Sequence, residues 1–145
     1  MGLTVLDASA VVPLMMTHPL TQAAEKCIRY WKREYYHLVS PCFMPVEAAS
    51  ALRRAVYSGK FDPQQAQEAV GIMMGMGIEF IVPDIEVLQS SLTWAERLGQ
   101  SKAYDAQYAA LAERLGAELW SADQRLVHVL KEQGVAWAHW VGEVS

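Results

Sequence analysis

The sequence predicts an α/β fold in which helices cover both faces of a mostly parallel sheet. Short apolar runs alternate with longer amphipathic segments along almost the whole chain, which is the pattern of strands joined by helical crossovers. The chain has 145 residues, the usual length of one domain, and no segment has the composition of a linker. We therefore expect one domain that spans residues 1–145.

Five short apolar runs are expected to form the strands, since most of them end at a residue that stops a strand. In chain order they cover residues 3–6, 37–40, 79–82 and 118–120, and part of the tail at 135–141. The first run stops at Asp7, and Pro41 and Pro83 close the second and third, because proline cannot donate a ladder hydrogen bond. The tail is expected to supply an edge strand.

The segments between these runs are expected to form helices, because their apolar residues recur at helical spacing and their ends carry capping residues. In chain order they cover residues 20–33, 46–58, 62–75, 85–98, 103–115 and 123–133. Asp62 and Asp84 are suited to begin helices, whereas Gly59, Gly116 and Gly134 are suited to end them. The helical pair between the second and third strands fits a right-handed crossover.

Composition narrows the class of protein. The longest nearly apolar stretch, residues 70–78, is interrupted by glycines and is too short to span a bilayer, and the first residues lack the pattern of a signal peptide. We expect a cytoplasmic protein without membrane association. Cys27 and Cys42 show no metal or disulfide spacing and are expected to be reduced core residues. The net charge of −4 argues against a nucleic-acid binder unless several acids bind metal.

Four acids are candidates for one shared site. Asp7 directly follows the first strand, and Asp123 lies three residues after Trp120 at the end of the fourth strand. Ligands of open parallel sheets bind beyond the carboxyl ends of the strands, so both aspartates are expected at that edge. Glu47 and Asp105 lie in the first turns of two helices, and their placement at the same edge does not follow from the strand order alone.

Each of these acids also has a purely structural explanation. Carboxylates favour helix N-termini, where they cap backbone N–H groups and meet the positive end of the helix dipole. Asp7 is different because it lies between two apolar runs, where an unpaired buried carboxylate costs several kcal/mol. Its partner is expected to be either a metal ion or a local cap that involves Asp7 or Ser9.

The surroundings of these acids resemble a known family. Four motifs resemble those of the PIN-domain family in their usual order, and the closest likeness is to VapC-type toxins. These motifs are VLDASA at 5–10, VEAASAL at 46–52, YDAQYAALA at 104–112 and LWSADQRL at 119–126. The resemblance covers residues 3–130, and its specificity lies in the combination of all four acids.

This resemblance implies a three-layer α/β/α sandwich and a metal-dependent endoribonuclease. It implies that an acidic quartet, Asp7, Glu47, Asp105 and Asp123, binds Mg²⁺ or Mn²⁺ and cleaves RNA. Oxygen ligands suit these hard ions, and the histidines are too scattered to form a nitrogen site for zinc. The resemblance further implies a homodimer that is restrained by a cognate antitoxin.

Other residues are expected to support this quartet. Ser9 and Ser121 resemble hydroxyls that orient the acids or metal-bound water, although Ser50 and Ser121 stand where Asn and Thr are common in the family. Arg54 lies two helical turns after Glu47, on nearly the same face, where it would contact substrate or form a salt bridge with a surface acid.

Three alternatives remain open at the level of sequence. The first is a catalytically silent PIN-like module that binds an antitoxin or RNA while its acids only cap helices. The second is a phosphatase that attacks through Asp7, although no second acid follows closely to serve as a general acid. The third is a DNA nuclease of related fold, because no residue in the sequence identifies a reader of the 2′-hydroxyl.

Overall fold

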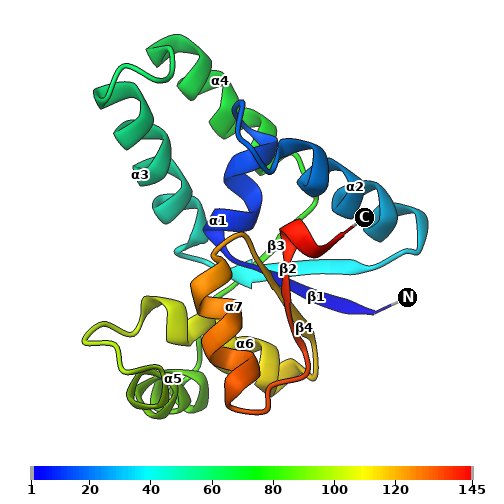
Figure 1. The fold of residues 1–145 in the computed structure, drawn as a ribbon, viewed down its shortest axis with the longest axis vertical. Coiled ribbons are helices and arrows are strands. Elements are labelled where there is room, and N and C mark those ends of the chain that lie inside the picture. The colour runs from blue at the N-terminus through cyan, green and yellow to red at the C-terminus, as the bar shows by residue number, and fades with distance from the viewer. Residues whose placement is uncertain (1, 145) are drawn as a thin grey trace.

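A five-stranded parallel sheet forms the centre of the molecule, as a computed structural model that describes residues 2–144 shows (Figure 1). The strand order is β3-β2-β1-β4-β5, and every neighbouring pair is parallel. The strands are β1 (Leu3–Leu6), β2 (His37–Pro41), β3 (Glu79–Ile81), β4 (Glu118–Ser121) and β5 (Ala138–Trp140). The predicted parallel sheet is therefore confirmed, including an edge strand within the tail.

Helices cover both faces of this sheet. They are α1 (Ala8–Val11), α2 (Thr21–Arg33), α3 (Met44–Tyr57), α4 (Pro63–Met74), α5 (Ile85–Leu98), α6 (Tyr104–Leu115) and α7 (Gln124–Glu132), with short 3₁₀ turns η1 (Val12–Leu14) and η2 (Val141–Glu143). Helices α1–α4 lie on one side and α5–α7 on the other (Figure 1). Right-handed crossovers explain this division, because the chain moves from β1 through β2 to β3 in one direction and from β3 through β4 to β5 in the other. The three-layer α/β/α class is confirmed.

The predicted helix termini agree with the local chemistry. The side chains of Asp62 and Asp84 accept hydrogen bonds of 2.9 Å from backbone N–H groups in the first turns of α4 and α5. Gly116 ends α6 with φ 62°, in the left-handed region that favours glycine. Capping therefore fixes where these helices meet the loops that surround the sheet.

Two details differ from the sequence-based expectations. Helix α1 follows β1 directly, although the apolar run after Asp7 is too short to show helical spacing. Cys42 is exposed, so its expected core position is wrong, whereas Cys27 is buried as predicted. Cys42 follows the last residue of β2 in the loop before α3, outside the packed sheet.

No helix within residues 2–144 combines the length and the apolar character needed to cross a membrane.

Two buried hydroxyls in the central strands provide a stability test. Thr4 is fully buried and its Oγ1 has no hydrogen-bond partner in the described part of the chain, whereas Ser40 Oγ donates to Leu6 O at 2.7 Å. Thr4→Val keeps the side-chain shape and removes an unsatisfied group, so it should raise the free energy of unfolding by about 1 kcal/mol. Ser40→Ala should lower it by about 1–3 kcal/mol. Urea denaturation measures the free energy of unfolding of both variants. A Thr4→Val variant less stable than the wild type would contradict the conclusion that the Thr4 hydroxyl is unsatisfied.

Candidate active site

The sheet has one point where the direction of the strand order reverses, between β1 and β4, and an acidic cavity lies there. Asp7 follows the last residue of β1, and Asp123 lies two residues after the end of β4. The Asp7 N–H donates to Trp120 O at 3.3 Å, which keeps the two strand ends together. Both aspartates line a cavity of about 380 Å³.

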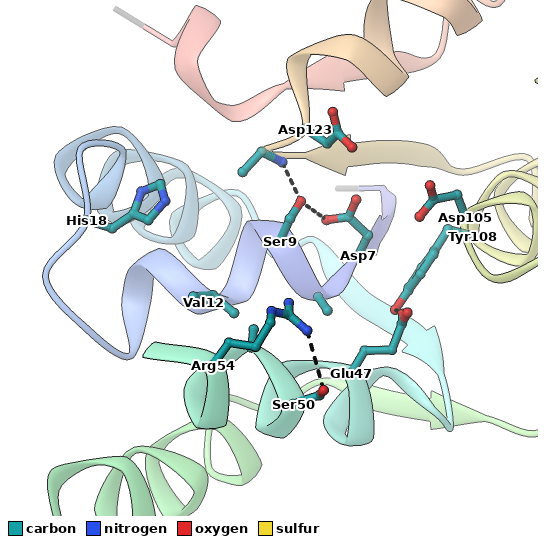
Figure 2. Close-up of a pocket in the computed structure, with 13 residues that line it drawn as sticks. Asp7, Ser9, Val12, His18, Glu47, Ser50, Arg54, Asp105, Tyr108 and Asp123 are labelled. Atoms are coloured by element: carbon teal, nitrogen blue, oxygen red, sulfur yellow. Dashed lines mark hydrogen bonds between the residues drawn. The ribbon is translucent and has the colours of Figure 1, made fainter. Parts of the chain in front are cut away.

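Glu47 and Asp105 line the same cavity, so the structure brings all four predicted acids together (Figure 2). Helix α3 begins shortly after β2 ends, which places Glu47 at the carboxyl edge. Helix α6 leads into β4 from the opposite direction, so its first turn, with Asp105, starts at that edge as well. The direction of each helix relative to its strand therefore supplies the two placements that the strand order alone left open.

A network of hydroxyls holds Asp7 in place. Asp7 Oδ1 accepts hydrogen bonds from Ser9 Oγ at 2.7 Å and from Ala10 N at 2.9 Å. Ser9 Oγ also lies 3.2 Å from Ser121 Oγ. It accepts from Ala122 N at 2.9 Å, a hydrogen bond that is dashed in Figure 2. The two serines predicted to support the site thus join the end of β1 to the end of β4.

The other three acids are each held through one oxygen. Tyr108 Oη donates to Glu47 Oε1 at 2.5 Å, and Gln100 Nε2 donates to Asp105 Oδ2 at 3.1 Å. Asp123 Oδ1 accepts from two backbone N–H groups at the start of α7, at 3.1 and 3.2 Å. Since these bonds go to a single oxygen in each carboxylate, the second oxygen of each is available to a cation.

Three residues at this site were not predicted from the sequence. Tyr108 lies three residues after Asp105 on the same helix, a spacing that indicates a shared face. Gln100 comes from the loop before α6, where no periodic signal exists. His18 also lines the cavity, with its Nδ1 accepting from Leu20 N at 3.0 Å, although the scattered histidines gave no reason to expect one there.

Burial and repulsion by neighbouring acids raise the pKa values of Asp7, Glu47 and Asp105. Burial raises the pKa of Asp7 to about 6, against the opposing effect of hydrogen bonds from Ser121, Ser9 and Ala10 N. Burial also raises the pKa values of Glu47 and Asp105, and each gains a further increase from a neighbouring acid. A cation in the cavity would reverse this effect by stabilising the ionised forms.

The donor set fits Mg²⁺ or Mn²⁺ better than zinc. The cavity offers carboxylate and hydroxyl oxygens, which hard divalent ions prefer, and His18 is the one histidine among its lining residues. Within residues 2–144, no three His, Cys, Asp or Glu side chains already converge as a closed ligand set. Ion binding would therefore require rotation of the carboxylates toward one another.

Arg54 lines the cavity opposite the strand ends (Figure 2). Its Nη1 lies 3.4 Å from Ser50 Oγ, and no acid in residues 2–144 forms an ion pair with it within 4.0 Å. Its positive charge lowers the pKa of Glu47 in part. The alternative of a surface salt bridge is therefore not realised, and the guanidinium remains available to an anionic ligand.

Comparisons with known proteins agree with the topology. Three solved structures share the fold. PAE2754 of Pyrobaculum aerophilum has 24% identity and a TM-score of 0.66, over 96% of this chain and 89% of that one. VapBC2 of Rickettsia felis, bound to a promoter DNA fragment, has 13% identity and a TM-score of 0.68, over 95% of this chain and 98% of that one. VapC20 of Mycobacterium tuberculosis, a sarcin-ricin loop cleaving toxin, has 15% identity and a TM-score of 0.66, over 86% of this chain and 93% of that one.

Sequence comparison identifies the family directly. No curated protein matches the chain. A family model does match, the PIN domain, over residues 4–132. This match spans all four acids and every element from β1 to α7. The chain therefore belongs to the PIN domain family.

Proposed function

We propose that this chain is a Mg²⁺- or Mn²⁺-dependent endoribonuclease that hydrolyses RNA phosphodiester bonds. The observation that carries this proposal is the cavity at the strand-order reversal, where four different elements contribute one carboxylate each. These acids are Asp7, Glu47, Asp105 and Asp123. Membership of the PIN domain family supports a nuclease, and the fold shared with a sarcin-ricin loop cleaving toxin supports RNA as substrate.

The proposed reaction gives parts to the four acids, to two serines and to Arg54. The four acids would hold a divalent ion, and Ser9 and Ser121 would orient Asp7 through the hydroxyl network. Such an ion would supply a water molecule of lowered pKa and positive charge to neutralise the phosphate. Arg54 would bind a phosphate of the substrate, because it lines the cavity and pairs with no acid among residues 2–144. The protein thus mainly positions metal and substrate.

We further propose that the nuclease is the toxin component of a toxin–antitoxin pair, that it forms a homodimer and that it acts in the cytoplasm. Two similar folds belong to VapBC complexes, from Rickettsia felis and from nontypeable Haemophilus influenzae. Those complexes support a protein antitoxin as the partner of this chain. Co-expression with the protein encoded beside it, followed by co-purification, tests this part of the proposal.

Metal-dependent cleavage is the first expected outcome. Purified protein should cleave RNA in Mg²⁺ or Mn²⁺, and chelator should abolish the reaction. Asp7→Asn should lower the rate by at least about 100-fold, because losing a metal ligand should cost at least as much as losing a group that only orients one. Asp62→Asn is a matched control, since Asp62 caps α4 away from the cavity and Asn caps helices equally well. Gel analysis of cleavage products measures the rates.

Equal cleavage by wild type and Asp7→Asn would overturn the proposal. A measurement of metal binding distinguishes the proposed nuclease from a catalytically silent binding module. Mn²⁺ should raise the melting temperature of the wild type, but raise that of Asp7→Asn much less. No shift in either protein would favour the module.

The pH dependence of stability provides the second expected outcome. The pKa of Asp7 rises from 3.8 in the unfolded chain to about 6 in the folded one. The folded state therefore holds this proton more tightly, and that stabilisation, present below pH 4, should be lost as pH rises through 6. The loss should total about 3 kcal/mol in chelator. Chemical denaturation between pH 4 and 7 measures it. If the free energy of unfolding fell by the same amount in Asp7→Asn, the pH dependence would come from other groups.

Tyr108→Phe provides the third expected outcome. The ring of Tyr108 packs against Phe43 at 5.4 Å in the core, and phenylalanine keeps this packing while removing the hydroxyl that holds Glu47. The cleavage rate should fall about 10–100-fold, the usual effect of losing a group that orients a metal ligand. Higher Mn²⁺ concentration should restore part of the activity. An unchanged rate and metal dependence would show that Glu47 needs no such support.

A further inference from the structure

A second hollow adjoins the acidic cavity, and we propose that it binds one unpaired nucleotide of single-stranded RNA. This hollow, the loop hollow, has a volume of about 500 Å³ and shares Glu47 and Asp105 with the cavity. Its remaining lining residues are Gly99, Gln100, Ser101, Lys102 and Tyr104. The inference rests on the proposed function, because it assigns the neighbouring position of the same substrate.

Tyr104 supplies a surface on which a base can stack. Its side chain is 55% exposed, although it immediately precedes Asp105 at the start of α6. The ring packs edge-on against Phe43 at 5.9 Å, and Phe43 packs in the same manner against the buried Tyr108. Because Phe43 already holds the Tyr104 ring, the ring loses little conformational freedom on binding. Any base can stack on the part of the ring that is exposed to solvent.

Lys102 supplies a positive charge to the same hollow. It is exposed, and no acid forms an ion pair with it within 4.0 Å in the described part of the chain. The loop that carries it is tied to the acids, because Gln100 donates to Asp105 at 3.1 Å. The phosphate group next to the stacked base would therefore lie close to the Lys102 ammonium group.

The two hollows together define a path for a strand. Arg54 lies in the acidic cavity and Lys102 in the loop hollow, and Glu47 and Asp105 line both. A phosphodiester at the acids would thus have a cation in each of the two hollows. This arrangement matches the way proteins bind single strands, with charge along the backbone and an aromatic ring under a base.

Stacking on Tyr104 requires a base that is not paired. In duplex RNA the bases are stacked within the helix, so the ring would have no partner. A third hollow beside Asp123 contains Arg125 but no aromatic residue, and it offers charge without stacking. The preference for unpaired RNA is therefore assigned to the loop hollow.

Binding of a ten-nucleotide single-stranded RNA, and of the same sequence in a duplex, tests the proposal. Fluorescence anisotropy in Ca²⁺ gives Kd, with probe integrity checked on a gel. Tyr104→Ala should weaken single-strand binding about tenfold and leave duplex binding unchanged, whereas Tyr104→Phe should bind as the wild type does. Lys102→Gln should reduce the salt dependence of single-strand binding by about one phosphate contact. Tyr57→Ala is the matched control, since Tyr57 is 82% exposed at the far end of α3.

Three results would overturn the subsite: no single-strand binding by the wild type, unchanged Kd in Tyr104→Ala, or an equal loss for single strand and duplex. Cleavage assays on the same variants separate this inference from the proposed function. Metal-dependent cleavage with unchanged Kd in Tyr104→Ala would reject the subsite alone. Selective loss of binding in Tyr104→Ala, together with no cleavage of RNA by the wild type, would support the subsite and reject the nuclease.

Discussion

The buried carboxylate of Asp7 is the constraint around which the functional edge of the sheet is organised. Its side chain is 4% exposed at the junction of β1 and α1, where an ionised group without partners would be costly. Ser9 and the Ala10 N–H offset part of that cost. Ser9 in turn binds the start of the loop after β4. The hydrogen bonds that accommodate one charge therefore also join the two strands between which the cavity opens.

The same loop is held from its other side by the C-terminal part of the chain. Ala122 donates its N–H to Ser9 Oγ at 2.9 Å, and its carbonyl oxygen accepts from Trp140 Nε1 at 3.2 Å. Both backbone polar groups of Ala122 are thus fixed, immediately before Asp123. Strand β5 is short, yet its last residue, Trp140, helps to hold the residue that precedes the fourth acid of the cavity. The edge strand and the geometry of the cavity are linked here through the backbone of a single residue.

Much of this arrangement follows from sequence, and the failures have identifiable causes. Asp7 and Asp123 lie within two residues of the ends of β1 and β4, so the sheet topology alone locates them. Glu47 and Asp105 required the directions of α3 and α6, which apolar periodicity does not specify. Gln100 lies in a loop, where contacts depend on tertiary structure that no local pattern encodes. Helix α1 was missed because four residues are too few for a periodic signal.

In the proposed function, charge would also link metal binding to RNA binding. The chain carries a net charge of −4, and the centre of its cavity is acidic, so phosphate should be repelled while the carboxylates are ionised and metal is absent. Arg54 and Lys102, neither of which forms an ion pair with an acid among residues 2–144, lie in the two hollows that share Glu47 and Asp105. A divalent ion would convert the repulsive centre into a third point of attraction. Substrate affinity and metal occupancy should therefore rise together, because each neutralises charge that opposes the other.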